Sequence, residues 1–224
     1  MVKKAVGDGN SASVDPREQE LTLFANAISR HIDKKIKLVL EYGCGVGRLA
    51  RKVLEINKAI ELIGVTDSPQ QLNSALAFVN SERFEVLLPH ELTRTVDLVY
   101  CTSILNHLPA VELRDALHRM HSSLKLGGKI IIFAPDIRRA VRFDKPEFFD
   151  DRCLGVNLRN EIQRFFEPKS ALFTEQELAE NPEIGIVLAP KPESEVQNAW
   201  LAQPALVYSR REFDGPAFNI PYRT

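Results

Sequence analysis

Residues 39–47, with the sequence VLEYGCGVG, constrain the fold more than any other part of the chain. The apolar start of this segment is typical of a buried strand, and its glycines permit a turn in which the backbone approaches a ligand closely. The pattern of residues 48–56 then favours a helix. A strand, a glycine turn and a helix in this order predict a binding site of the nucleotide type.

The spacing of the glycines separates two kinds of nucleotide site. Gly43, Gly45 and Gly47 form the pattern G-x-G-x-G, and Glu41 lies two residues before the first of them. The dinucleotide fingerprint is G-x-G-x-x-G, in which the helix N-terminus receives a pyrophosphate. Its last glycine would fall at Arg48. The segment therefore departs from the dinucleotide pattern.

Strand and helix patterns alternate along the first 134 residues. Helices are expected to begin near residues 15, 48 and 68, and a further helix is expected to end at Gly127 and Gly128. This alternation predicts an α/β domain with a doubly wound, mostly parallel sheet and helices on both faces. The expected strands are residues 37–42, 61–67, 84–88, 96–101 and 129–134.

The rest of the chain does not follow this alternation. Residues 136–173 hold six of the twelve phenylalanines together with several arginines, and we interpret them as an inserted substrate cap. Residues 184–188 and 205–209 are expected to close the sheet as two antiparallel strands. Residues 1–14 predict a flexible tail, so residues 15–224 are expected to form a single domain.

Composition limits the partners of the chain. The formal net charge of −1 gives no general attraction for a polyanion, so nucleic acid is not an expected partner. The cysteines, Cys44, Cys101 and Cys153, form no C-x-x-C pair, which favours a reducing compartment and predicts a cytoplasmic protein. No apolar run approaches the ~20 residues that span a bilayer, so no membrane partner is expected.

A carboxylate follows the second expected strand. Asp67 lies twenty residues beyond Gly47, where a carboxylate can accept hydrogen bonds from both hydroxyls of a ribose. The alternative is that Asp67 caps the next helix, but Ser68 already supplies a capping oxygen. The glycine turn and Asp67 together therefore predict an adenosine site. NAD-dependent enzymes use such an acid too, so the pair does not define the chemistry.

Further segments indicate a family. Residues 39–47 resemble motif I of the class I S-adenosylmethionine-dependent methyltransferases, and the start of a late helix in that family is similar to residues 173–178. The resemblance implies S-adenosylmethionine as cofactor and a seven-stranded sheet of order 3-2-1-4-5-7-6. Other motifs of the family are matched, in the family's order, by residues 62–69, 96–101, 104–108 and 124–132.

The resemblance also implies a set of cofactor-binding residues. It places Gly43 and Gly45 against the methionine part, Glu41 near the amino group, and Cys101 beside the loop that faces the reacting methyl group. Many relatives have an acid or amide near the adenine, just after the third strand, whereas this chain has Leu88. Leu88 is expected to offer apolar contact and backbone groups instead. Asp67 and Ser68 complete the expected set.

Chemistry at the acceptor requires different residues. His107 follows the fourth strand, where an imidazole could act as a general base towards a hydroxyl acceptor, or could simply pack at a helix start. Tyr100 and Asn106, with Thr102 and Asp136, lie at or beyond carboxyl ends of strands and could orient the acceptor. No metal is expected. His118 and His121 lie three residues apart on one helix, a spacing compatible with a metal, but both lie off its apolar stripe, which favours a solvated helix face.

The cap suggests the character of the acceptor. If its phenylalanines and its arginines, Arg138 and Arg139, face the cofactor, they form an apolar lid with a cationic rim, suited to a small acceptor that bears a carboxylate or phosphate. The alternative is that the phenylalanines are ordinary core residues and the arginines are ordinary surface residues. The sequence therefore predicts methyl transfer to oxygen or nitrogen of a small molecule. The alternatives are a non-catalytic cofactor-binding or regulatory module and an NAD-dependent oxidoreductase.

Overall fold

The computed structural model describes residues 16–102, 104–133, 158–180 and 205–210. The expected tail of residues 1–14 lies outside these ranges. The expected strand of residues 184–188 and the two cap arginines, Arg138 and Arg139, lie outside them as well.

Seven strands form one sheet of order β3-β2-β1-β4-β5-β7-β6, which confirms the predicted order. Strands β1 to β5 pair in parallel, and β7 pairs antiparallel with both β5 and β6. The strands are β1 (Leu38–Tyr42), β2 (Glu61–Val65), β3 (Phe84–Leu87), β4 (Val96–Thr102), β5 (Leu124–Phe133), β6 (Phe166–Ala171) and β7 (Ala205–Arg210).

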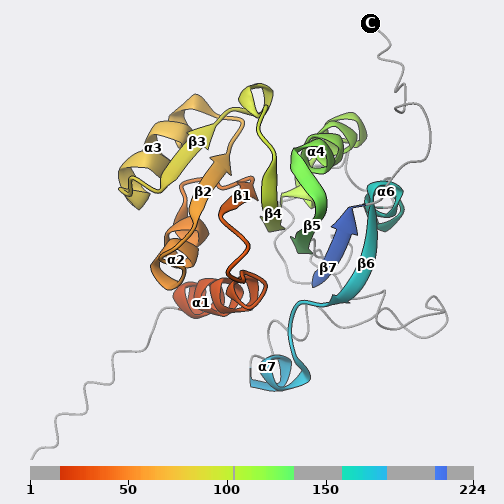
Figure 1. The fold of residues 1–224 in the computed structure, drawn as a ribbon. Helices are drawn as coiled ribbons and strands as arrows, with labels where there is room; N and C mark the ends of the chain where they lie inside the picture. The colour runs from red at the N-terminus through yellow and green to blue at the C-terminus, as the bar shows by residue number, and fades with distance from the viewer. Residues whose placement is uncertain (1–15, 103, 134–157, 181–204, 211–224) are drawn as a thin grey trace, which may run out of the picture.

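Helices pack on both faces of this sheet, as the alternation predicted. In Figure 1, α1, α2 and α3 surround β1 to β3, and α4 and α6 lie beside β5 to β7. No helix within the described ranges has the length and apolar composition needed to cross a membrane. The helices are α1 (Pro16–Ser29), α2 (Arg48–Ile56), α3 (Pro69–Val79), α4 (Ala110–Ser123), α6 (Leu158–Phe165) and α7 (Glu175–Glu180), with short 3₁₀ turns η1 (Pro89–Glu91) and η2 (Leu105–His107).

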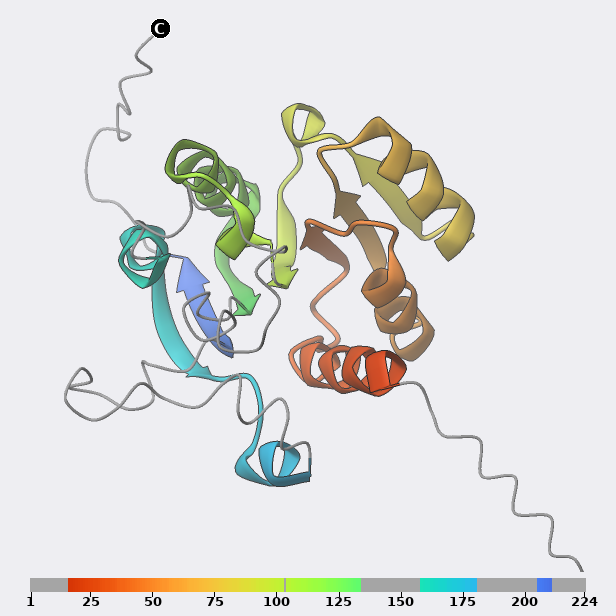
Figure 2. The same ribbon diagram turned by 180° about the vertical axis from the view of Figure 1, so that it is seen from behind.

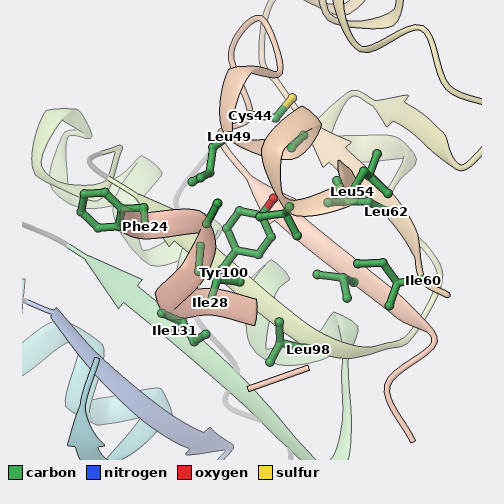
Figure 3. Packing of buried hydrophobic residues seen from close by; sticks show 14 of the residues in the cluster. Phe24, Ile28, Cys44, Leu49, Leu54, Ile60, Leu62, Leu98, Tyr100 and Ile131 are labelled. Atoms are coloured by element: carbon green, nitrogen blue, oxygen red, sulfur yellow. The ribbon is translucent and has the colours of Figure 1, made fainter. Parts of the chain in front are cut away.

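The alternation of side chains along each strand divides the core into two layers. In β1, Val39 packs in the layer that includes α1, α2 and α3, whereas Leu40 packs in the layer that includes α4 and α6. Figure 3 shows the first layer, where Tyr100 of β4 lies with Ile28 of α1 and Leu49 of α2. Because helices cover both faces, a ligand reaches such a sheet at the carboxyl ends of its strands.

The predicted cap of residues 136–173 extends too far along the chain, because α6 and β6 lie within it. Figure 2 shows β6 beside β7, at the end of the sheet. Phe166 is fully buried beside His121 of α4, with ring centroids 5.9 Å apart, and Phe173 packs on Phe24 at 5.2 Å. These phenylalanines belong to the core. The burial of His121 also corrects its expected place on a solvated face.

Strand β5 begins earlier than predicted. Helix α4 ends at Ser123, and Leu124 already pairs with Val96 of β4. The glycine pair, Gly127 and Gly128, therefore lies inside β5 and does not end the helix. Gly127 has a φ of 75°, and the β4–β5 register shifts in this region, so the glycines accompany an irregular strand.

An ion pair joins α4 to α6. Arg114 donates two hydrogen bonds to the carboxylate of Glu161, at 2.9 and 3.0 Å. Glu161 is 7% exposed, and its hydrogen bond with Arg114 lowers the pKa of this carboxyl below its usual value. The pair thus fixes α6 against α4 on the face opposite to α1 to α3.

Candidate active site

The glycine turn joins the end of β1 to the start of α2. The carbonyl of Val65, the last residue of β2, accepts hydrogen bonds from the backbone nitrogens of Gly43 and Cys44, both at 2.9 Å. Gly47 then donates to the carbonyl of Cys44 at 2.8 Å. The turn is thereby fixed to the carboxyl end of the neighbouring strand.

Gly47 and Gly45, two glycines of the turn, are required at their positions for different structural reasons. Gly47 has a φ of 80°, and a Cβ there would lie 2.6 Å from Cγ2 of Val79 in α3, so a side chain is excluded by packing. Gly45 has a φ of 53°, but a Cβ there would meet nothing within 4 Å among the described residues. Gly45 therefore leaves its backbone open to a ligand, as a cofactor cradle requires.

Glu41 lies under the turn with only 2% of its surface exposed. Its carboxyl group accepts a hydrogen bond from the hydroxyl of Tyr100 at 3.0 Å and another from the backbone N–H of Ala50. Burial raises the pKa of Glu41 to about 8, although both hydrogen bonds act in the opposite direction. Since Gly47, the N-cap of α2, has no side-chain cap, Glu41 satisfies a first-turn N–H of α2 from β1.

Three residues expected to face the ligand are buried. The side chain of Glu41 contacts the protein interior, and Tyr100 is fully buried with its hydroxyl engaged by Glu41. Cys101 is fully buried in the layer that includes α4, and burial raises the pKa of its thiol above the usual range. The geometry gives Glu41 and Tyr100 a role behind the glycine turn and offers the Tyr100 hydroxyl to no acceptor.

Asp67 lies at the same edge of the sheet as the glycine turn. Tyr42 and Val65 are register partners, so the chains that leave β1 and β2 emerge side by side. Asp67 is exposed and makes no hydrogen bond or ion pair with any residue that the structure describes. Ser68 caps α3, because its hydroxyl accepts from the backbone nitrogen of Gln71 at 3.4 Å. The carboxylate of Asp67 is therefore available to a ligand.

Leu88 follows β3, the next strand along this edge. Its backbone N–H donates to the carboxylate of Glu91 at 2.7 Å, and its carbonyl accepts from the nitrogen of Glu91 at 2.9 Å. Sequence reasoning expected Leu88 to offer backbone groups to a base. The structure engages its N–H elsewhere, which leaves mainly its half-buried side chain for an adenine.

The segment after β4 lies across the glycine turn. Ile104 covers Gly43, because a Cβ on Gly43 would lie 2.7 Å from Cδ1 of Ile104. Sequence reasoning did not single out this contact, which joins residues sixty-one positions apart. Asn106 and His107 follow in η2, where the nitrogen of His107 donates to the carbonyl of Ile104 at 2.9 Å and the side chain of His107 is exposed. His107 is thus tied to the residue above the turn.

Possible metal ligands do not gather within the described ranges, where no group of three or more His, Cys, Asp or Glu could hold an ion. His118 is exposed, as predicted. Asp115, its neighbour on α4, accepts a hydrogen bond from Arg119 at 2.6 Å.

The residues present fit an S-adenosyl cofactor. The open backbone at Gly45 allows close approach, and the unpartnered carboxylate of Asp67 can accept from a sugar diol. Neighbouring strands lie about 4.8 Å apart, so one adenosine spans the edge from β1 to β3. The sheet order and the glycine turn define the class I methyltransferase fold, as the sequence motifs predicted.

Comparison with known proteins agrees with this class. Residues 40–130 match a family model described as a methyltransferase domain, which confirms the predicted resemblance over that range. An uncharacterized methyltransferase from Anoxybacillus flavithermus is 31% identical over 112 residues, which cover 48% of this chain and 51% of the relative. The chain spans about half the length of the curated relatives it matches.

Two solved structures share the fold over most of the chain. A protein from Pyrococcus horikoshii superposes with a TM-score of 0.59 at 16% identity, covering 90% of this chain and 94% of that one. A TehB-like SAM-dependent methyltransferase from Corynebacterium glutamicum superposes with a TM-score of 0.56 at 15% identity, covering 84% and 88%. At these identities the likeness establishes the fold.

Proposed function

We propose that the protein is an S-adenosylmethionine-dependent methyltransferase that acts on oxygen or nitrogen of a small-molecule acceptor. The observation that carries this proposal is the open backbone of Gly45 at the same edge of the sheet as the unpartnered carboxylate of Asp67. Both lie within residues 40–130, which match the methyltransferase-domain model. When bound, the cofactor supplies an electrophilic methyl group on a sulfonium.

The chain's own residues would bind and orient the reactants. Asp67 accepts hydrogen bonds from the two ribose hydroxyls, and the backbone at Gly45 receives the methionine part. In-line alignment of the acceptor atom with the methyl group can supply up to ~7 to 11 kcal/mol of the barrier. Asn106 orients the acceptor from η2, and Leu88 packs against the adenine.

His107 is the proposed general base. It is exposed in η2, and its backbone is bonded to Ile104 above the glycine turn. For a hydroxyl acceptor, the imidazole of His107 takes the proton as the oxygen attacks the methyl group. An amine acceptor that enters unprotonated loses its proton after transfer, so it depends less on His107.

The acceptor is proposed to carry a carboxylate or phosphate, paired with Arg138 and Arg139. This part of the proposal is supported by sequence composition alone, because both arginines lie outside the described residues. Replacing both with alanine is expected to raise the KM for the acceptor, whereas an unchanged KM would remove the anionic acceptor from the proposal.

The experiment that tests the activity uses methyl-labelled S-adenosylmethionine and pools of metabolites. The purified protein is expected to form S-adenosylhomocysteine only when an acceptor is present, and one metabolite is expected to gain the mass of a methylene. Asp67→Asn should reduce this turnover, whereas Glu82→Gln, a change at an exposed turn residue before β3, should not. Cofactor binding without turnover on any pool would favour the non-catalytic module.

A further inference from the structure

A buried hydrogen-bond chain lies directly behind the glycine turn. Glu41 and Tyr100 are register partners on adjacent strands, so their side chains lie on the same face of the sheet. The hydroxyl of Tyr100 donates to Glu41 at 3.0 Å, and both residues are at least 98% buried. The ring of Tyr100 is held by Ile28 and Leu49, which Figure 3 shows around it.

This chain of contacts ends at α2. The Glu41 carboxyl accepts from the backbone N–H of Ala50, in the first turn of the helix, where Gly47 provides no side-chain cap. Without the Tyr100 hydroxyl, the Glu41 carboxyl would keep only its bond with Ala50 and would be held less firmly in orientation. Tyr100 thus orients the Glu41 carboxyl, and this carboxyl holds the first turn of α2. The glycine turn lies between α2 and β1.

We propose that Tyr100 is a positioning residue for the cofactor: through Glu41, its hydroxyl holds the first turn of α2 and thereby the form of the glycine turn. The inference rests on the proposed function, because it concerns the same site. Tyr100 touches neither cofactor nor acceptor in this account. Its loss changes the geometry that the backbone of Gly45 presents to the methionine part.

The test measures binding of S-adenosylhomocysteine by calorimetry to the wild type and to Tyr100→Phe, which removes only the hydroxyl. Loss of one hydrogen bond to a buried carboxyl is expected to weaken binding roughly tenfold. The matched control is Ile60→Val, which removes a methylene from the same core layer at a residue that the account does not place around Tyr100. It is expected to lower the thermal midpoint while leaving Kd unchanged, so a merely structural role of Tyr100 would resemble this control.

A second pair of variants tests the route through Glu41. In a Glu41→Met background, which lacks the carboxyl, adding Tyr100→Phe is expected to change Kd no further. An additional tenfold loss would contradict the route, and wild-type affinity in Tyr100→Phe alone would overturn the inference. If Tyr100→Phe does not fold, Glu41→Met alone is expected to bind at least tenfold more weakly, and unchanged affinity there is the overturning result. Failure of the wild type to bind refutes the proposed function itself.

Discussion

Replacing Glu41 with glutamine should change how the stability of the fold depends on pH. Burial raises the pKa of Glu41 from 4.5 to about 8, so the carboxyl is neutral in the folded protein across a range in which the unfolded chain has ionised it. The folded state then binds more protons than the unfolded state. The contribution of Glu41 is therefore fully present below pH 4.5 and is lost as the pH rises to about 8.

The size of this effect follows from the displacement of the pKa. One pKa unit corresponds to about 1.4 kcal/mol, so the wild type should lose about that much stability per pH unit between roughly pH 5 and 8. Glutamine keeps the shape of Glu41 and can bond both Tyr100 and Ala50, but it does not titrate. Between pH 5.5 and 7.5 the wild type should thus lose about 3 kcal/mol relative to Glu41→Gln.

Urea unfolding of both proteins at several pH values measures this difference. The exposed residue Glu82 offers a matched control, because Glu82→Gln removes a carboxylate of the same size outside the core. Its stability curve should run parallel to that of the wild type. If the Glu41→Gln curve also runs parallel, the pKa of Glu41 is not raised in the folded protein, and the account of a buried neutral carboxyl is wrong.

The remaining predictions concern the turn, the α4–α6 pair and the base. Gly45→Ala should weaken S-adenosylhomocysteine binding and cost only the backbone strain of a positive φ, since its methyl group meets open space. Gly47→Ala should destabilise the fold more, because the same strain is joined by a clash with Val79. Arg114→Ala should lower the free energy of unfolding by about 1 to 3 kcal/mol, because it leaves the carboxylate of Glu161 buried without its main partner. Because the pairing lowers the pKa of Glu161, the difference between the two proteins in urea unfolding should disappear as the pH falls below the pKa of a free carboxyl and through the lowered pKa of Glu161. His107→Gln should lower kcat about 100-fold for a hydroxyl acceptor and leave cofactor Kd unchanged in calorimetry.

Each of these predictions has a contrary result. Equal stability of the two glycine variants would refute the steric distinction within the turn. An Arg114→Ala protein as stable as the wild type at neutral pH would show that Glu161 finds water instead. Unchanged kcat in His107→Gln would leave the histidine as a residue that only caps or packs.

The family resemblance predicted the sheet order, whereas periodicity and turn residues, which are local signals, predicted the parallel half. Helix α2 begins and ends where the pattern of residues 48–56 placed it, and Ser68 caps α3 as expected. The C-terminal half was harder to predict, since the phenylalanine content of the segment that holds Phe166 and Phe173 is the same whether these residues form a lid or a core. Their burial depends on which distant residues they meet.

The same reason limits what the sequence could predict of the site. The glycine spacing and Asp67 are adjacent to strand ends, so their placement followed from the strand pattern. The bond between Glu41 and Tyr100 joins two strands, and the cover of Gly43 by Ile104 depends on the loop after β4. These contacts require the register of β1 and β4, which no local pattern contains.

Calorimetry of the wild-type protein with S-adenosylhomocysteine and, separately, with NAD tests the central claim most directly. The account predicts saturable binding of S-adenosylhomocysteine that Asp67→Asn weakens, and no heat with NAD. Saturable binding of NAD together with no heat from S-adenosylhomocysteine would contradict it.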